Sequence, residues 1–155
     1  MSMTIGLSVL DTSLYISDLR PKRKETALRE MVARAALAGV VSEPLVLEEA
    51  LLLRERLGST SVGKGVAVPN ARSLAVIDPR LMVARSRRGI DWGSSDGLDI
   101  HLVFLVLSPG ECPDESHHEF VARAVAVARL QRNRQKLLEA SSFDAVASVL
   151  REASP

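Results

Sequence analysis

Apolar residues in the first third of the chain recur at helical spacing. Between Lys24 and Ala38 they mark one face of a helix, and Gly39 supplies a stop. A second helix is predicted from about Pro44 to Leu57, because proline favours the first turn and Gly58 follows the last apolar residue. The sequence therefore opens with two successive amphipathic helices. The residues expected to face the core from the first of them are Ala27, Leu28, Met31, Val32 and Ala35.

Short apolar runs predict strands in the middle of the chain. They are Leu14–Leu19, Val66–Val68, Leu81–Ser86 and Ile100–Leu107. Proline lacks the N–H that a strand ladder uses, so Pro69 is expected to end the second of these strands. The run at Ile100–Leu107 is continuously apolar after His101, which suits a central strand covered on both faces. The segment from Arg87 to Gly97 is rich in glycine and is predicted to form turns with one edge element.

Helical spacing returns in the last third of the chain, over about Ser116–Leu130, Arg134–Ala140 and Phe143–Glu152. Strands in the middle and helices at both ends predict an α/β fold in which a mixed β-sheet is sandwiched by helices. No repeat, low-complexity tract or linker divides the sequence. Residues 1–155 are therefore expected to form a single domain.

Composition narrows the function classes. The chain has 155 residues, with 20 Lys and Arg against 19 Asp and Glu, a formal charge of +1. This balance argues against nucleic-acid binding by bulk charge and against a polybasic membrane-surface protein. Aromatic residues are 3% of the chain, too few for base-stacking platforms. We expect no nucleic-acid partner.

The single cysteine, Cys112, cannot form an internal disulfide, which fits a reducing compartment. It also excludes a cysteine-based metal site, and the three histidines lack the usual zinc-ligand spacing. We expect neither a metal nor a cofactor. The first ten residues lack signal-peptide character, and the longest apolar runs are far too short to span a bilayer. A cytoplasmic protein without membrane insertion is the expectation.

Candidate chemistry begins with the histidines. Ser116-His117-His118-Glu119 matches a capping box, which would place His117 in the first turn of a helix, where the dipole favours an anion. The alternative is that both histidines are solvated residues at a helix start. His118 is expected to face solvent. His101 is expected to share a strand face with Val103 and Leu105, as a core or edge residue.

A second group of candidates lies where the second predicted helix ends. Arg54 and Arg56 stand just before Ser59 and Thr60, in a loop that continues to Gly65. Hydroxyl groups and flexible glycine backbone can hold a phosphate. Arginines at a helix C-terminus, however, are favourable to the dipole whatever else they do. Both interpretations stay open from the residues alone.

The order of these motifs resembles a known family. From Leu52 to Arg72 the chain reads LLRERLGSTSVGKGVAVPNAR, which is similar to the signature of the type-2 enzyme IIA domain of the sugar phosphotransferase system (PTS). The resemblance is to the fructose/mannitol and nitrogen-regulatory (PtsN-like) branch, and extends from about Leu14 to Ala153. The later blocks that carry it are Arg88–Trp92, Asp96-Gly97, Val103–Leu105, Pro109 and His117.

This resemblance implies a fold and a reaction. The fold is the enzyme IIA fructose/mannitol-type α/β sandwich, with its site at the end of the strand Val66–Val68. Members of the family accept a phosphoryl group from the phosphohistidine of the carrier HPr onto a histidine ring nitrogen. Sugar-type members pass it to a cysteine of an enzyme IIB protein. Nitrogen-regulatory members instead control other proteins, such as transporters and sensor kinases.

The sequence departs from the family at the acceptor itself. The resemblance places the phospho-acceptor histidine directly after Pro69, where this chain has Asn70. A neutral imidazole offers a lone pair that can attack phosphorus, whereas the lone pair of an amide nitrogen is delocalised into the carbonyl. Losing an essential nucleophile costs a factor of about 10⁴–10⁶ in rate. Asn70 is therefore predicted to be catalytically inactive.

Other residues of the family site are retained. By resemblance, Arg54 lies beside the phosphoryl group, His117 is the second histidine that supports it, and Ser59 and Thr60 form the phosphate-side loop. We predict a regulatory protein that acts by binding a partner such as an HPr-like phosphocarrier, an enzyme IIB-like protein, a transporter or a sensor kinase. One alternative is a phosphotransferase component that uses His117 as a surrogate acceptor, or in which Asn70 is an engineered replacement. Another is a sensor of anions or sugar phosphates.

Overall fold

The most apolar run of the sequence forms the central strand of a six-stranded sheet in the computed structural model, within the residues it describes, 7–152. This strand, β6 (Ile100–Pro109), pairs antiparallel with β5 (Arg80–Ile90) and parallel with β3 (Val66–Ala67) and β4 (Asn70–Ser73). At the two edges, β1 (Tyr15–Ile16) pairs parallel with β5, and β2 (Ser61–Gly63) pairs antiparallel with β3. The expected mixed sheet and its central strand are confirmed.

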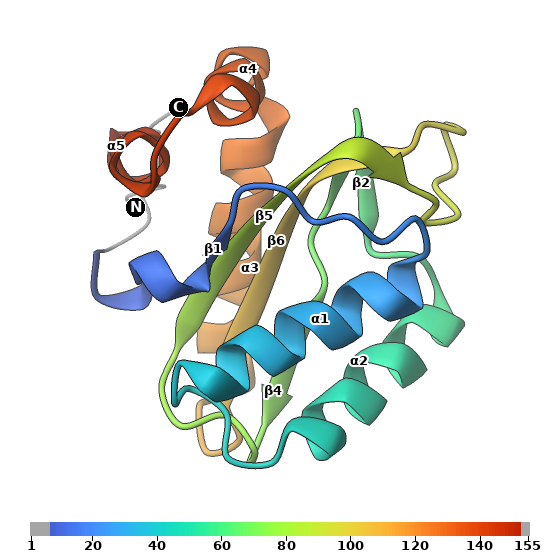
Figure 1. Cartoon of the computed structure of the whole chain (residues 1–155). Coiled ribbons are helices and arrows are strands. Elements are labelled where there is room, and N and C mark those ends of the chain that lie inside the picture. Colours follow the sequence, from blue (N-terminus) through green and yellow to red (C-terminus); the bar gives the residue numbers. More distant parts are fainter. Residues whose placement is uncertain (1–6, 153–155) are drawn as a thin grey trace.

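Helices cover both faces of this sheet (Figure 1). On one face lie α1 (Lys24–Leu37) and α2 (Pro44–Leu57); on the other lie α3 (Asp114–Arg129), α4 (Gln131–Glu139) and α5 (Phe143–Glu152). Two short 3₁₀ turns, Leu7–Val9 and Thr12–Leu14, precede β1. The predicted α/β sandwich is confirmed. No helix among residues 7–152 is long and apolar enough to cross a membrane.

Strand alternation divides the apolar side chains between two cores. Val103, Leu105 and Leu107 pack with α1 and α2, whereas Leu102, Phe104 and Val106 pack with α3, α4 and α5. Successive residues of a strand point to opposite faces, so a strand that is apolar at every position can serve both layers. This arrangement buries β6 and fixes the position of the strands beside it.

The strand β3 ends at Ala67, before Pro69, so the predicted end of this strand is confirmed, but pairing with β6 begins again after the proline. The ladder is interrupted after Ala67 and resumes at Asn70, so that both β3 and β4 lie parallel to β6. Proline lacks an N–H but keeps its carbonyl, and the Pro69 oxygen accepts a hydrogen bond from the Val106 N–H at 3.0 Å. Asn70 is consequently held in the sheet as the first residue of β4.

Helix starts were harder to predict than helix existence. The bounds of α2 and α5 are as expected, but α3 begins at Asp114, two residues before Ser116. The predicted capping box at Ser116 and Glu119 is therefore wrong. Pro113 is the N-cap residue, and no side chain caps the helix. Asp114 and Glu115 stand in the first turn, where carboxylates favour the dipole. The predicted first strand is also shortened, to Tyr15–Ile16.

Candidate functional site

Asn70 lies at the start of β4, with its amide group held at both ends. Its Nδ2 donates a hydrogen bond to the Val68 carbonyl at 3.0 Å, and its Oδ1 lies 3.2 Å from Nε2 of His117. The first contact fixes which end of the amide is nitrogen, because a carbonyl can only accept. Oδ1 is thus the acceptor facing His117. The structure brings together two predicted site residues that are 47 positions apart.

The position of His117 is set by α3 and by the end of β6. Its backbone N–H already donates to the Pro113 carbonyl at 3.1 Å, so it is not one of the free N–H groups expected at the helix start. Its side chain is buried, and Nδ1 lies 2.8 Å from the hydroxyl of Ser108. Because Asn70 Oδ1 can only accept, Nε2 carries the proton in the neutral ring. Nδ1 then accepts from the Ser108 hydroxyl.

The resulting chain runs from Ser108 through His117 to Asn70. Its polarity matches that of hydrolytic triads, in which a hydroxyl or thiol donates to an imidazole that an amide or carboxylate orients. Ser108, however, is only 1% exposed, so its hydroxyl does not reach a substrate in this conformation. The chain holds the imidazole in one tautomer and one orientation. Both ring nitrogens of His117 are occupied by neighbours.

Charge and burial around His117 favour the neutral ring. Burial is the largest cause that lowers the pKa of His117 below its ordinary value of 6.5, followed by the positive charges of His118 and Arg72. Asp114 acts in the opposite direction, but it is already paired with Arg72 at 2.6 Å. A neutral His117 is what the hydrogen bond from Ser108 requires.

Stability is therefore expected to depend on the protonation of His117. Below pH 6.5 the unfolded chain binds a proton at this residue that the folded chain does not, so the free energy of unfolding falls as the pH drops through 6.5 toward the lower folded pKa. Urea unfolding of the protein and of His117→Gln at a series of pH values measures this contribution. The difference between them should shrink on acidification. The exposed neighbour provides the control, since His118→Gln should keep most of the dependence; an unchanged difference would contradict the assignment.

Arg54 lies on the exposed side of the last turn of α2. Its Nη1 donates to the Gly58 carbonyl at 2.7 Å, so the side chain caps the end of its own helix. Among residues 7–152 no hydrogen bond or ion pair joins Arg54 to Asn70 or His117. Arg56 is also exposed, and lines a cavity of about 310 Å³ between α1 and α2. The role of Arg54 beside a phosphoryl group stays a prediction.

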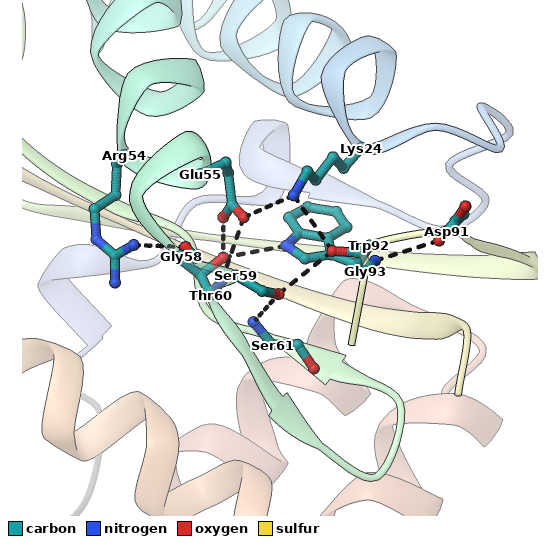
Figure 2. Close-up of polar contacts among 10 residues, drawn as sticks. All are labelled: Lys24, Arg54, Glu55, Gly58, Ser59, Thr60, Ser61, Asp91, Trp92 and Gly93. Carbon is teal, nitrogen blue, oxygen red and sulfur yellow. Dashed lines mark hydrogen bonds and ion pairs between the residues drawn. The ribbon is translucent and has the colours of Figure 1, made fainter. Parts of the chain in front are cut away.

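The loop at Ser59 and Thr60 is anchored by a polar network that includes buried Glu55 and Trp92 (Figure 2). The carboxylate of Glu55 accepts from the Thr60 hydroxyl and from the Thr60 N–H, the latter at 3.3 Å. Indole Nε1 of Trp92 donates to the same hydroxyl at 3.2 Å. The Ser59 hydroxyl donates to the Trp92 carbonyl at 3.3 Å and accepts from the Ser61 N–H at 3.1 Å. The loop is thereby tied to the segment after β5.

Lys24 completes this network from the start of α1. Its ammonium group lies 3.4 Å from Glu55 Oε2 and 3.3 Å from the Trp92 carbonyl oxygen (Figure 2). The Glu55 side chain is 3% exposed and that of Lys24 is 21% exposed, so the ion pair is largely desolvated. Sequence reasoning missed Glu55, Lys24 and Trp92. The signal was a glutamate between two arginines and the single tryptophan of the chain, but nothing in their spacing indicates that they meet.

The remaining candidates lie away from this site. His118 is exposed, as expected. His101 lines a cavity with Leu138 of α4, whereas Val103 and Leu105 pack on the α1 side, so the prediction that the three share a face is wrong. The alternation fails because the N–H groups of both His101 and Leu102 donate to the Gly65 carbonyl, which is the mark of a bulge. Within residues 7–152 no group of three or more His, Cys, Asp or Glu side chains is placed so that it could hold a metal ion.

Comparison with known proteins gives a consistent family. Residues 8–153 match the family described as "Phosphoenolpyruvate-dependent sugar phosphotransferase system, EIIA 2". A nitrogen regulatory protein of Bradyrhizobium diazoefficiens is 38% identical over 132 residues, covering 85% of each chain. A PTS fructose-specific EIIA component of Haloferax volcanii is 35% identical over 152 residues, covering 98% of each. A fructose-specific EIIABC component of Bacillus subtilis is 34% identical over 135 residues, which are 87% of this chain but 21% of that protein.

Solved structures agree on the fold. The nitrogen regulatory protein IIA-Ntr of Neisseria meningitidis superposes with a TM-score of 0.85 at 26% identity, over 92% of this chain and 97% of that one. Enzyme IIA of the Escherichia coli mannitol system, in a complex with phosphorylated enzyme IIB, gives a TM-score of 0.78 at 21% identity, over 91% and 96%. The fructose/mannitol-type enzyme IIA fold expected from the sequence is confirmed.

Proposed function

Since this chain belongs to the EIIA 2 family of the phosphoenolpyruvate-dependent sugar phosphotransferase system, we propose that it is a regulatory member that does not accept a phosphoryl group. In this proposal Asn70 occupies the position of the family's acceptor histidine. The protein acts in the cytoplasm by binding a partner, in a state that corresponds to the unphosphorylated family member.

The observation that supports this proposal is the environment of the Asn70 amide. Nδ2 donates to the Val68 carbonyl and Oδ1 accepts from His117, so the side chain satisfies its neighbours without offering a lone pair to phosphorus. A bound phosphoryl group carries nearly two negative charges at neutral pH, enough to repel a partner or reorganise an interface. A protein that never acquires this charge would keep one affinity for its partner.

A surface suited to such a partner lies beside Arg54. At the end of α2 two leucines project into solvent: Leu53 is 54% exposed and Leu57 is 80% exposed. Arginine is enriched in protein interfaces, and exposed leucines provide apolar area that a partner can bury at the centre of one. By analogy with the family, we propose an HPr-like phosphocarrier or an enzyme IIB-like protein as the partner; a transporter or sensor kinase is the alternative class.

Partner binding is expected to depend on Leu57. Calorimetric titration with the HPr and enzyme IIB proteins of the same genome should show binding that Leu57→Asp weakens at least about fivefold, because the loss of an anchor residue costs more than about 1 kcal/mol. Leu37, 87% exposed at the C-terminal end of α1, supplies the matched control Leu37→Asp. Equal loss in both variants would contradict the proposal.

Phosphoryl transfer through His117 has less support. Nε2 carries the proton directed at Asn70, and the lone pair of Nδ1 is directed at buried Ser108, so neither nitrogen presents a lone pair to solvent. In-line attack also depends on the position of the attacking atom, and the family resemblance assigns that position to residue 70 rather than to His117. If phosphoryl labelling occurred and disappeared in His117→Ala, this second function would replace the first.

A further inference from the structure

A long bulge interrupts the pairing of β5 with β6, far from Asn70. Arg85 pairs with Leu102 and Ile90 pairs with Ile100, so five steps along β5 correspond to two along β6. The extra residues form a loop of the strand that includes Arg87 and Arg88. Asn70 pairs with Val106, five residues along β6 from His101, which is about 17 Å at the usual rise of a strand. Bulges recur where a strand redirects side chains toward a site.

This bulge is held in one conformation by specific contacts. The Ser86 hydroxyl accepts from the Gly89 N–H at 3.1 Å, and His101 Nδ1 donates to the Ser86 carbonyl at 2.7 Å. Gly89 has φ of 89°, and a Cβ at that position would lie 2.9 Å from the Asp99 Cβ, so only glycine fits. His101, which the sequence left as a core or edge residue, is therefore a positioning residue for the bulge.

The bulge forms one wall of a cavity of about 480 Å³, lined by Arg85, Ser86, Arg87, His101 and Leu138. Arg85 is buried, and only 6% of its surface is exposed. Its Nε donates to the Ser17 carbonyl at 3.0 Å, and its Nη1 donates to the carbonyls of Leu138 at 2.8 Å and Ala140 at 2.7 Å. Nη2 has no hydrogen-bond partner within the described part of the chain.

No carboxylate pairs with this buried guanidinium among residues 7–152. The carbonyls at the end of α4 offset part of its charge, since a helix C-terminus favours a cation. A buried charge without a counter-ion is nevertheless costly. Asp18 is already engaged, accepting from the Arg87 N–H at 3.3 Å and lying 3.5 Å from Arg20 Nε. An anion in the cavity would supply the missing negative charge.

Basic residues from a second segment extend the positive surface. Leu19 donates its N–H to the Arg85 carbonyl at 2.7 Å, and Asp91 donates its N–H to the Lys22 carbonyl at 2.8 Å, so the run around Lys22 lies along the bulge. Arg20, Lys22, Arg23 and Arg88 are all exposed there. With a formal charge of only +1 for the whole chain, this concentration of cations is local. Such a surface raises the local concentration of anions.

We propose that this cavity is an anion-binding site that takes the phosphate group of a small phosphorylated metabolite. Arg85 and Arg87 of one strand line the cavity, a guanidinium group suits phosphate oxygens, and Leu138 offers apolar contact to the rest of the molecule. The volume falls in the range of small-molecule sites. The proposal does not depend on the function proposed for Asn70, because the two sites lie at different ends of β6.

Two neighbouring arginines make the test sharp. Arg87 lines the cavity and Arg88 does not, while both are exposed and carry the same charge. NMR titration of the protein, Arg87→Gln and Arg88→Gln with inorganic phosphate, glucose 6-phosphate and sulfate at low ionic strength should show saturable shifts at residues 85–89. Arg87→Gln should weaken binding about tenfold or more, and Arg88→Gln less than about threefold. Tighter binding of glucose 6-phosphate than of inorganic phosphate would identify a metabolite site rather than a free-phosphate site.

Three results would overturn the proposal. The first is equal weakening by both substitutions, which would mean attraction by bulk charge alone. The second is shifts confined to residues 54–60, 70 and 117, which would place anion binding at the other site. The third is the absence of saturable shifts with all three anions. Folding of each variant is checked from the dispersion of its own spectrum, so a folding defect is not mistaken for lost binding.

Discussion

Replacement of Asn70 by histidine is expected to confer phosphoryl acceptance on a protein that otherwise has none. After incubation with phosphorylated HPr, intact-mass analysis should show no added phosphoryl group on the protein and one on Asn70→His. The expected difference in rate is a factor of about 10⁴–10⁶, the usual effect of an essential nucleophile. The imidazole would enter a position where Val68 and His117 already offer hydrogen-bond partners.

The control for this experiment keeps an amide at the same position. Asn70→Gln should remain unmodified, because its nitrogen lone pair is also delocalised. A stable phosphoryl group on the unaltered protein would refute the function proposed above. Failure of Asn70→His to react, with the fold intact, would show that residues around position 70 have lost their competence as well.

Removal of the Glu55 carboxylate is expected to cause a large loss of stability. Glu55→Ala leaves the Lys24 ammonium without its anion and the Thr60 N–H without an acceptor. Breaking a buried ion pair costs about 3–5 kcal/mol, and because Lys24 is partly exposed we expect a value near the lower end, about 3 kcal/mol. Urea unfolding at neutral pH measures the change in free energy.

The same helix offers a matched control in Glu49, which is exposed. Glu49→Ala should change the free energy of unfolding by less than about 0.5 kcal/mol, as is usual for surface positions. Near-equal effects of the two substitutions would contradict a structural role for the Glu55 network. Because Thr60 and Ser59 are held through this network, Glu55→Ala should also broaden the NMR signals of residues 59–61.

The periodicity of apolar residues predicted the layers of this fold, because buried positions of a helix or strand are apolar and recur at the spacing of that element. The apolar face of α1 and the unbroken run of β6 each require a covering layer, and that requirement is visible without coordinates. The strand at Asn70 was not predictable in the same way. A proline normally interrupts pairing, and only the neighbouring β6 decides whether the ladder resumes after it.

The residues of the candidate site were also predictable only in part. The resemblance placed Asn70 and His117 at one site, and the structure brings their side chains into hydrogen-bond contact. It did not indicate Ser108, which sets the tautomer of His117, or the Glu55 network that holds the loop. These residues act through contacts between positions 5 to 68 apart in the sequence, and hydrophobic periodicity does not record such contacts.

The hydrogen bonds of the Asn70 amide have a consequence for inheritance. Histidine and asparagine codons differ in a single base, and the amide leaves neither Val68 nor His117 without a partner. Asn70 therefore fits this position of the fold with both ends of its amide hydrogen-bonded. Under the function proposed above, a single base change would separate a phosphoryl acceptor from a protein that acts by binding alone.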